Sequence, residues 1–525
     1  MPEVTIVGAG IAGLTATLRL LERGFRVRLL EQDDFIGGKW GAYKHPGRSG
    51  HDQKRPIYHE HSYHMFLNWY NNFWEIVDEL DLRDNFEPRT SIKYLRRGER
   101  SCFTELGNVG SMKTFWPNMF SGVLPISDMF IYNYSLIDLI AQPIHRGEFL
   151  DQYSVNGFMR SRLYATDAAA EHHQRTLAKA FACPSYLTSA STYKSFIKFG
   201  FRHPDPMMWV LRGNCEEYFH QPLLQRLQQY GDRFSLNLRS RVRRLHLDGS
   251  GRIDAIEVAR LDRSPTVHAQ PSIKVLERTR MPIDGDLIVA VPPGAFAQLV
   301  DDDVFRAAPE LGDLNRLRSE PMASVDLYFK TKLPDIPKEH VVLLDSRYDL
   351  TFIDNSQLWP GETTTFLNVV ASEFDPLAGL PADRALDYVI QELRSYVTFD
   401  LADIDQHRTR IQTNCGEKLF VNQVGSWPLR PQTTCRIPNL FIAGDYCQTC
   451  IDVVTIEGAV VSGLQAAEAV RRRAGVGRPI RIIQPDAYPE SLMAIAALAW
   501  APYAYYAKLW AWGDELAGAV TGVQR

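Results

Sequence analysis

The sequence has no excess charge of either sign, no long apolar run and none of the common hydrolytic motifs. Its 525 residues include 58 Lys and Arg and 62 Asp and Glu, a formal net charge of −4, so electrostatics gives no reason to expect nucleic acid as a partner. No uncharged apolar run reaches the roughly 18 residues that a membrane span needs. The H-E-x-x-H, G-x-S-x-G and P-loop patterns are absent, so we expect neither hydrolytic chemistry of these kinds nor a metal site.

Cysteine is also sparse. The seven cysteines are scattered and odd in number, which does not indicate a disulfide framework. Cys447 and Cys450 have the C-x-x-C spacing of redox and zinc motifs, but no second pair lies near them, so packing is the favoured interpretation. Because Val4–Val7 already has the pattern of a buried strand, we expect no secretory signal and a reducing, cytoplasmic setting.

The start of the chain carries a glycine-rich series, GAGIAGLTATLRLLERGFRVRLLEQDDFIGGKW, from Gly8 to Trp40. The largely β-branched run Val4–Val7 before it predicts a parallel strand buried on both faces. Gly8 permits a tight turn, Gly10 lets the backbone approach a pyrophosphate, and Gly13 lets the next helix lie close to the strand.

The residues after these glycines complete the pattern. Apolar residues at helical spacing predict an amphipathic helix from Gly13 to Arg23, whose N-terminus offers free N–H groups to phosphates. A second strand, Phe25–Leu30, leads to Glu31, and a carboxylate at that place accepts hydrogen bonds from a ribose hydroxyl. Strand, glycines, helix, strand and acid in this order predict a dinucleotide-binding fold.

The doublet Gly37-Gly38, followed by Lys39, bears on which dinucleotide is bound. Five residues separate Glu31 from Gly37, and the pattern E-x₅₋₆-G-G-[RK] continues the adenosine-binding strand of flavoproteins with two dinucleotide-binding domains. The segment resembles the FAD-binding start of the amine oxidase and carotenoid desaturase superfamily. This resemblance implies FAD, rather than NAD, as the cofactor.

The C-terminal part of the chain fits the same resemblance. Asn439–Tyr446 predicts an apolar strand that ends at Gly444 and Asp445, where the acid can hydrogen-bond a ribityl chain. Thr455–Gly463 opens a helix that runs to Arg473, with its N-terminus toward the edge of the flavin where negative charge develops on reduction.

The middle of the chain is expected to supply the adenine side. Asn214–Tyr230 predicts a helix, Phe234–Leu245 a pair of strands, and Ile253–Val258 a continuation of that meander. In the superfamily this element lays backbone groups near the adenine, here those of Val242. Asp286–Pro293 would then return the chain to the FAD domain.

Within the superfamily, the sequence is most similar to the plant and cyanobacterial type of phytoene and ζ-carotene desaturases, over about residues 1–475. Four segments carry this likeness: Glu60–Asn71, Leu211–Tyr218, Val342–Ser356, and the pair Ala443–Tyr446 with Glu457–Val460. The resemblance implies FAD contact by Ala12, Glu31, Gln32, Lys39, His64, Met65, Tyr70, Asp445 and Ile456, besides the glycines Gly8, Gly10, Gly13, Gly37, Gly38 and Gly444.

Candidate catalytic residues follow from the first of these segments. His61, Tyr63 and His64 belong to a loop that the family places beside the isoalloxazine. His64 is a candidate for positioning the flavin, and either histidine could carry a proton, but a hydrogen-bonded structural role is an open alternative. Glu457, at a helix start, is interpreted as a cap or dipole partner rather than a base.

The sequence also departs from the family. Ser62 stands where glycine is usual, and the loop from Asp445 to Glu457 is one residue longer. Tyr218 takes the place of an arginine implicated in the substrate or quinone site, which argues against plain desaturation of phytoene.

The tail is rich in aromatic residues. Leu492–Ala501 is apolar, Pro502 is expected to interrupt it, and Tyr503–Trp512 holds a single lysine. Such a segment suits the interface of a bilayer, and this would attach a cytoplasmic protein peripherally to the inner membrane face. The alternative is a helix packed on the protein itself or on a second subunit of a homo-oligomer.

These features predict an α/β fold, a Rossmann-like FAD-binding fold with two dinucleotide-binding domains. Its discontinuous FAD domain comprises residues 1–75, 206–300 and 430–475. An α+β substrate domain comprises 76–205 and 301–429, with the helix-rich insert Thr114–Phe201 and strands at Ser324–Phe329 and Thr364–Val370. An amphipathic, aromatic helical extension covers 476–525.

The predicted function is an FAD-dependent oxidoreductase that dehydrogenates a hydrophobic, isoprenoid substrate. The cofactor carries most of this chemistry, because the hydride passes to flavin N5, and a quinone or oxygen would then take the electrons. One alternative is a flavin oxidase of amines or amino acids, in which an arginine such as Arg202 or Arg212 would clamp a carboxylate. A second alternative is a flavin-binding partner protein without turnover.

Overall fold

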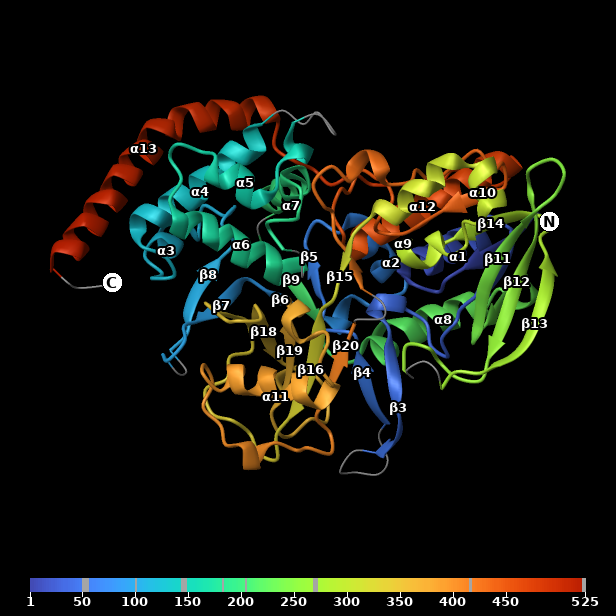
Figure 1. Ribbon diagram of the computed structural model, residues 1–525, viewed down its shortest axis with the longest axis horizontal. Coiled ribbons are helices and arrows are strands. Elements are labelled where there is room, and N and C mark those ends of the chain that lie inside the picture. Colours follow the sequence, from blue (N-terminus) through green and yellow to red (C-terminus); the bar gives the residue numbers. More distant parts are fainter. Residues whose placement is uncertain are drawn as a thin grey trace.

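The computed structural model describes residues 1–49, 56–99, 102–142, 149–181, 184–203, 205–267, 272–414 and 418–521. Three parts are visible in Figure 1: a sheet with packed helices near the N-terminus, a second sheet with α11 below the centre, and a group of helices that ends in α13. These parts meet around β5 (Met65–Leu67), β9 (Met208–Leu211) and β15 (Ser319–Glu320), close to the middle of the molecule.

The first part is built on a parallel five-stranded sheet. Its strand order is β10-β2-β1-β14-β22, with bounds Phe234–Asn237, Arg26–Leu30, Glu3–Val7, Asp286–Val289 and Leu440–Ile442. Helices α1 (Ile11–Glu22) and α12 (Ile456–Ala474) pack together in this part. Strands from widely separated stretches of the chain therefore form one sheet, and the predicted α/β fold with a discontinuous nucleotide-binding part is confirmed.

The expected pair of strands within Phe234–Leu245 is wrong in its pairing. β10 pairs with β2 at the edge of the parallel sheet, whereas β11 (Ser240–Leu247) begins an antiparallel meander with β12 (Ile253–Leu261) and β13 (Val275–Pro282). Between β10 and β11, Arg239 has a left-handed φ of 53°. This turn takes the chain out of one sheet and into the other.

The helix expected at Asn214–Tyr230 is present in two pieces. A π-helical turn, Glu216–His220, precedes α8 (Gln221–Gln228). Pro222 is the second residue of α8, and it has no N–H that could donate to the Tyr218 carbonyl. That carbonyl instead accepts a hydrogen bond from the side chain of Asn85 at 2.8 Å.

The second part is a seven-stranded sheet of order β20-β16-β19-β18-β17-β7-β8. The strands expected at Ser324–Phe329 and Thr364–Val370 are confirmed as the antiparallel neighbours β16 (Ala323–Tyr328) and β19 (Phe366–Ala371). The hairpin expected within Val342–Ser356 is confirmed as well. The other strands are β17 (His340–Leu343), β18 (Leu350–Asp354), β20 (Arg410–Thr413), β7 (Ser91–Leu95) and β8 (Thr104–Gly107), and α11 (Ala382–Leu393) packs on the sheet.

A small three-stranded sheet, β5-β9-β6, leads from the histidine loop toward the helical group. Its strands are Met65–Leu67, Met208–Leu211 and Phe86–Arg89, and α2 (Asn71–Glu79) follows β5. The helix-rich character expected for Thr114–Phe201 is confirmed. The helices there are α3 (Phe115–Met119), α4 (Ile126–Ala141), α5 (Val155–Arg160), α6 (Asp167–Phe181) and α7 (Ala190–Arg202).

The expected interruption at Pro502 is wrong. One helix, α13 (Glu490–Thr521), continues through Pro502 and packs along α4. The side chain of Pro502 is exposed. Its ring and the Leu498 carbonyl, to which proline has no N–H to donate, therefore do not disturb the packed side of the helix. Within the part of the chain that the structure describes, no helix combines the length and apolar character that crossing a bilayer requires.

Candidate cofactor and active site

A cavity of about 860 Å³ opens at the carboxyl ends of the parallel strands, the edge where α/β folds bind their ligands. The residues expected to contact the cofactor line it, except Gly13. The lining members are Gly8, Gly10, Ala12, Glu31, Gln32, Gly37, Gly38, Lys39, His64, Met65, Tyr70, Val242, Gly444, Asp445 and Ile456. The three candidate catalytic residues, His61, Tyr63 and His64, line the same cavity.

Gly8 and Gly13 permit a turn that no larger residue would allow. Gly8 has φ +100°, and a Cβ on it would lie 2.4 Å from the Ala290 carbonyl oxygen. A Cβ on Gly13 would lie 2.0 Å from the carbonyl oxygen of Gly8. Gly13 therefore holds α1 against the strand, which is the role its place in the motif predicts, although it does not reach the cavity.

The two glycine motifs lie side by side. Gly37 donates its N–H to the carbonyl of Ala9 at 2.8 Å, and Gly10 and Gly37 form a parallel β-bridge. With no side chain on Gly10 or Gly38, the backbone at the N-terminus of α1 is open to the cavity. This arrangement suits a pyrophosphate, which binds best to backbone N–H groups at a helix start.

Glu31 is buried at the tip of β2 and held there by the backbone. Its carboxylate accepts hydrogen bonds from the N–H of Ala9 at 2.7 Å and from the N–H of Asp33 at 3.0 Å. A carboxylate has about four acceptor positions, so Glu31 can also accept a hydrogen bond from a ribose hydroxyl. The side chain of the neighbouring Gln32 is fixed by Arg241, whose Nε donates to its Oε1 at 2.9 Å.

Glu457 links the start of α12 to the start of α2. Thr455 caps α12, with its hydroxyl accepting from the Gly458 N–H at 3.1 Å. Glu457 is fully buried, and its two carboxylate oxygens accept from the N–H groups of Asn72 and Phe73, both at 2.9 Å. The interpretation of Glu457 as a cap is confirmed, but it caps α2 rather than its own helix. Burial raises its pKa to about 7, against the opposing effect of these amides.

The histidines of the loop before β5 are neutral at pH 7. Burial, reinforced by the positive charge of Lys39, lowers the pKa of His61 to about 4. Burial and the neighbouring His61 lower the pKa of His64 to about 3. His64 Nδ1 is buried and has no hydrogen-bond partner among the described residues, which leaves it available to a group bound in the cavity.

Tyr63, between the two histidines, turns its hydroxyl into the second sheet. The hydroxyl lies 2.7 Å from Nε2 of His340 and 2.5 Å from Oγ1 of Thr351. The backbone N–H of Tyr63 donates to Asn368 at 3.2 Å. Burial raises the pKa of Tyr63 above its ordinary range. Tyr63 therefore fixes the histidine loop to the second sheet.

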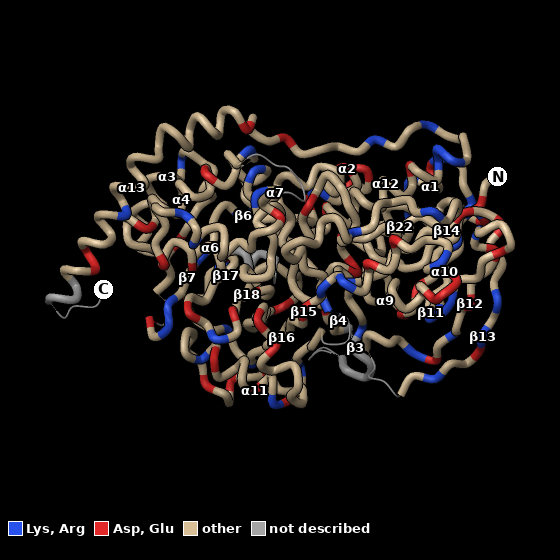
Figure 2. Tube along the Cα trace, turned by 45° about the horizontal axis from the view of Figure 1, so that its top comes forward, with Lys and Arg blue, Asp and Glu red and all other residues tan. Residues whose placement is uncertain are grey.

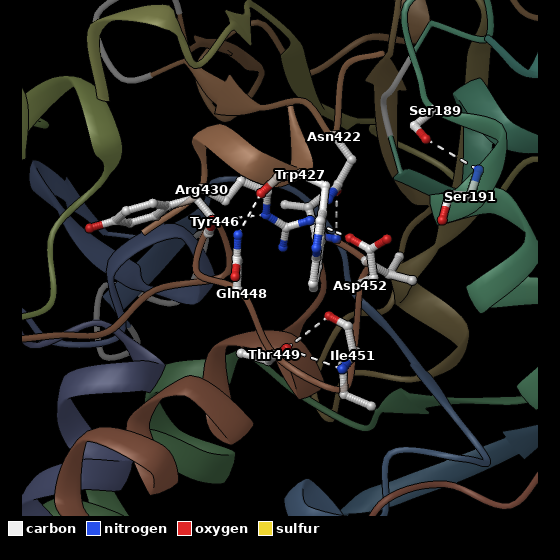
Figure 3. A network of polar contacts seen from close by, with 12 residues as sticks. Ser189, Ser191, Asn422, Trp427, Arg430, Tyr446, Gln448, Thr449, Ile451 and Asp452 are labelled. Carbon is white, nitrogen blue, oxygen red and sulfur yellow. Dashed lines mark hydrogen bonds and ion pairs between the residues drawn. The ribbon is translucent and has the colours of Figure 1, made fainter. Parts of the chain in front are cut away.

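A buried ion pair that the sequence did not indicate holds the loop after β22 (Figure 3). The guanidinium of Arg430 pairs with Asp452 and donates to the carbonyls of Tyr446 at 2.9 Å and Cys447 at 2.8 Å. In the same network, Gln448 donates to the Trp427 carbonyl at 2.7 Å. This network fixes the segment that follows Asp445, one of the cavity residues.

His220 is a second residue that the sequence did not indicate. Its Nε2 lies 2.6 Å from the Trp40 carbonyl oxygen, and a Cβ on Gly37 would lie 2.5 Å from the same nitrogen. Burial lowers the pKa of His220 to about 4. The neutral ring thus supports the turn that carries Gly37, Gly38 and Lys39 from outside the cavity.

Three residues considered for substrate binding do not line the cavity. Tyr218 packs its ring against Gly213, where an added Cβ would lie 2.1 Å from the ring. Arg202 lies over the ring of Tyr488, 5.3 Å from its centre. Arg212, half-exposed, lies 3.7 Å from Glu87. The arginines that do line the cavity, Arg241 and Arg243, belong to β11, beside Gln32.

Beside polar groups such as Ser372 and Lys418, the lining contributed from outside the parallel sheet has an apolar part. It includes Met65, Leu67, Phe196, Met322, Val370 and Phe420. These side chains come from β5, from α7 of the helical group, from the second sheet and from the short strand β21 (Leu419–Phe420). One cavity therefore has a polar glycine-rich side, which fits the predicted dinucleotide, and an apolar side, which fits a hydrophobic ligand.

Comparison with known proteins agrees with this geometry. The family of flavin containing amine oxidoreductases matches residues 11–471. The 15-cis-phytoene desaturase of Synechococcus elongatus is 24% identical over 509 residues, covering 92% of this chain and 100% of the relative. The probable zeta-carotene desaturase of the same organism is 22% identical, covering 89% of this chain and 98% of the relative.

Solved structures show the same fold. Putrescine oxidase, in a structure with bound putrescine, is similar with a TM-score of 0.64 and 16% identity, over 90% of this chain and 99% of that one. Cyclohexylamine oxidase from Brevibacterium oxydans IH-35A is similar with a TM-score of 0.61 and 15% identity, over the same shares of the two chains.

Proposed function

The chain belongs to the flavin containing amine oxidoreductase family and is a flavin-dependent oxidoreductase, and we propose that it uses FAD to desaturate a hydrophobic, isoprenoid hydrocarbon. The electrons then pass to a quinone or to oxygen. The observation that carries this proposal is the combination, in one cavity, of a dinucleotide cradle with an apolar side and uncharged histidines.

FAD, rather than a smaller flavin, is supported by the nucleotide half of the cavity. Glu31 offers acceptor positions where an adenosine ribose binds, and Val242 and Arg241 line the same end from β11. A flavin without the adenosine would leave Glu31 and this end of the cavity unused.

An apolar substrate is supported by the charges as well as by the lining. An alkylammonium substrate would be bound best by a carboxylate, but the described carboxylates that line the cavity, Glu31, Asp33 and Asp445, all follow strands of the parallel sheet. The two cavity histidines carry no charge at pH 7, because burial lowers the pKa of both. A hydrocarbon needs no ionic partner, so this environment favours it over an amine.

Desaturation removes a hydride and a proton from neighbouring carbons. A bound flavin supplies the hydride acceptor, at its N5. The apolar side chains Met322, Val370 and Phe420 would orient the hydrocarbon and exclude water. His64 Nδ1, which lacks a partner among the described residues, is the acceptor that could take the proton. Because its pKa is about 3, His64 does not retain that proton at pH 7.

The test is anaerobic bleaching of the flavin absorbance in the purified holoprotein. A panel of detergent-solubilised linear polyenes and isoprenoid hydrocarbons is compared with primary amines, diamines and amino acids at equal concentration. Bleaching by isoprenoids, with recovery on adding a quinone or air, is the expected result. Bleaching by amines alone would show that the protein is an amine oxidase. No bleaching by any compound would favour a binding protein without turnover.

A further inference from the structure

Most of the side chains that helix α13 buries are small, whereas most of its large apolar side chains are exposed. The side chains that it buries against the helical group are Met493, Ala497, Ala504, Ala507 and Ala511. A surface helix of a soluble protein normally does the reverse, with large apolar residues toward the core and polar residues outward. The polarity of α13 is therefore inverted along most of its length.

The exposed face forms one continuous stripe, which we call the outer stripe. With 3.6 residues per turn, residues 495, 498, 502, 506, 509, 513 and 516 lie opposite the buried positions. Leu498, Tyr506 and Leu509 are 77%, 69% and 64% exposed. Tyr503, Tyr505, Trp510 and Trp512 flank the stripe and are exposed as well.

Charge is almost absent from this segment. From Ser491 to Gly513 the only charged residue is Lys508, and its ammonium group donates to the carbonyl of Leu163 at 2.7 Å, toward the protein. Figure 2 shows a long uncoloured stretch of α13, whereas the β11–β13 end of the molecule carries many charges of both signs. The exposed face of α13 therefore has no charged side chains that would make its contact with water favourable.

A second exposed apolar group adjoins the helix. Met112, Trp116 and Phe120, on and around α3, are highly exposed. They connect to α13 through Phe115, whose ring centre lies 6.5 Å from that of Trp500. Exposed apolar side chains in such number are rare on soluble monomers and mark an interaction site.

We propose that the outer stripe of α13, together with Met112, Trp116 and Phe120, lies in the interfacial layer of a lipid membrane. The mixture of aliphatic side chains with Trp and Tyr is typical of that layer, where one end of each aromatic residue is apolar and the other is wet. A helix of 32 residues is about 48 Å long, and here it lies along the surface of the protein, so that it enters the membrane with one side only.

The shape of this surface favours lipid over a second copy of the chain. Figure 1 shows α13 on the outer rim of the helical group, with its C-terminal end extending past α3. Large side chains on a protruding rim need a partner that deforms around them, as lipid does. The proposal of a membrane-binding surface depends only on α13 and its neighbours, and not on which substrate binds in the cavity.

The charge pattern also determines the kind of membrane. Because the outer stripe has no cationic side chain, binding is driven by burial of apolar surface and does not require anionic lipid. We therefore expect the holoprotein to bind vesicles of pure phosphatidylcholine with equal affinity at about 0.1 M and about 1 M NaCl. Between these two concentrations the Debye length falls from about 10 Å to about 3 Å, so binding through charges would weaken.

The test compares two triple variants. In the first, Leu498, Tyr506 and Leu509 are replaced by Gln. In the control, three exposed leucines are replaced by Gln: Leu276 on β13, and Leu380 and Leu401 on either side of α11. Both elements lie apart from α13 in Figure 1. Partition is measured by co-sedimentation with phosphatidylcholine vesicles, and light scattering gives the oligomeric state of both variants. Flavin absorbance and circular dichroism show that each variant is folded.

The expected result is that the wild type and the control sediment with the vesicles equally, and that the first variant partitions at least tenfold less. A wild type that stays in the supernatant would overturn the proposal. It would also be overturned if the first variant bound like the wild type, or if the wild type were a dimer that this variant splits. None of these outcomes depends on the bleaching of the flavin by substrates.

Discussion

The side chains of Arg430 and Asp452 form an ion pair that is almost completely withdrawn from solvent, with exposures of 1% and 3%. The guanidinium also donates to the carbonyls of Tyr446 and Cys447. These contacts make Arg430 the fixed point of the loop between β22 and α12 (Figure 3). A buried ion pair of this kind adds little net stability, but removing one partner leaves the other charge buried and unpaired, which is strongly destabilising.

We therefore expect Arg430→Met to destabilise the protein by about 3–5 kcal/mol and to lower flavin retention, because the loop carrying Asp445 loses its support. Chemical denaturation and the flavin content after gel filtration measure the two effects. The control is Arg316→Met, which breaks an exposed pair with Asp313 and should cost less than about 1 kcal/mol. Equal effects of the two substitutions would contradict the role given to Arg430.

Glu60 gives a prediction about pH. Its carboxylate is buried, accepts from the Cys215 N–H at 2.7 Å, and has its pKa raised by burial to about 8, from an ordinary value of 4.5. The folded protein therefore binds this proton more tightly than the unfolded chain, so the associated stability is complete below pH 4.5 and is lost as the pH rises through 8.

In the Glu60→Gln variant, which cannot ionise, we expect the unfolding temperature to fall less between pH 5 and pH 9 than in the wild type. Since one pKa unit corresponds to about 1.4 kcal/mol, the difference between the two curves should be measurable by differential scanning fluorimetry. Glu277→Gln, at an exposed position of β13, serves as the control and should follow the wild-type curve. Parallel curves for Glu60→Gln and the wild type would contradict the raised pKa.

Glu31 gives a prediction about cofactor affinity. Replacing it by Gln keeps the volume but puts an amide nitrogen, which cannot accept a hydrogen bond, in place of one carboxylate oxygen. We expect the affinity of the apoprotein for FAD to fall about tenfold, which is about 1.4 kcal/mol. Flavin fluorescence titration measures it, and the exposed neighbour Asp34, replaced by Asn, is the control. Unchanged FAD affinity in Glu31→Gln would show that the adenosine binds elsewhere.

Leu67 gives a prediction about the substrate side. It is half-buried on β5 and lines the cavity, so Leu67→Gln places an amide where the hydrocarbon is proposed to bind. We expect at least a fivefold lower rate of anaerobic flavin bleaching by the isoprenoid substrate, with flavin content unchanged. Leu80→Gln, at a half-buried position outside the cavity lining, controls for general damage. If only the control slowed bleaching, the substrate would not contact β5.

The sequence predicted those features of the structure whose residues are close together in the chain. The turn at Gly8, the helix after it and the acid Glu31 are contiguous in the sequence, and each residue type has a steric or hydrogen-bonding reason for its place. The pairing of β10 cannot be predicted in this way, because its partner β2 lies about two hundred residues earlier and no local pattern identifies it.

The contacts that the sequence did not reveal join residues far apart in the chain. The hydroxyl of Tyr63 meets His340 across 277 positions of sequence, and His220 reaches the Trp40 carbonyl across 180. A lone histidine or arginine carries no pattern from which such a contact could be predicted. Pro502 failed as a helix breaker for a related reason, since it is harmless where its side chain faces outward, and the outward face is known only from the packing of α13.

The order of strands in the parallel sheet has a consequence for how the protein is made. β1 and β2 are synthesised first, but β22, which completes the sheet, follows more than four hundred residues later. A ribosome adds about 5–20 residues per second, so the glycine motif waits tens of seconds for its last neighbour. Until β22 is in place, the flavin cavity lacks the side formed by the residues that follow this strand, among them Gly444 and Asp445. Capture of the cofactor therefore follows the synthesis of β22, which brings these two residues to the cavity.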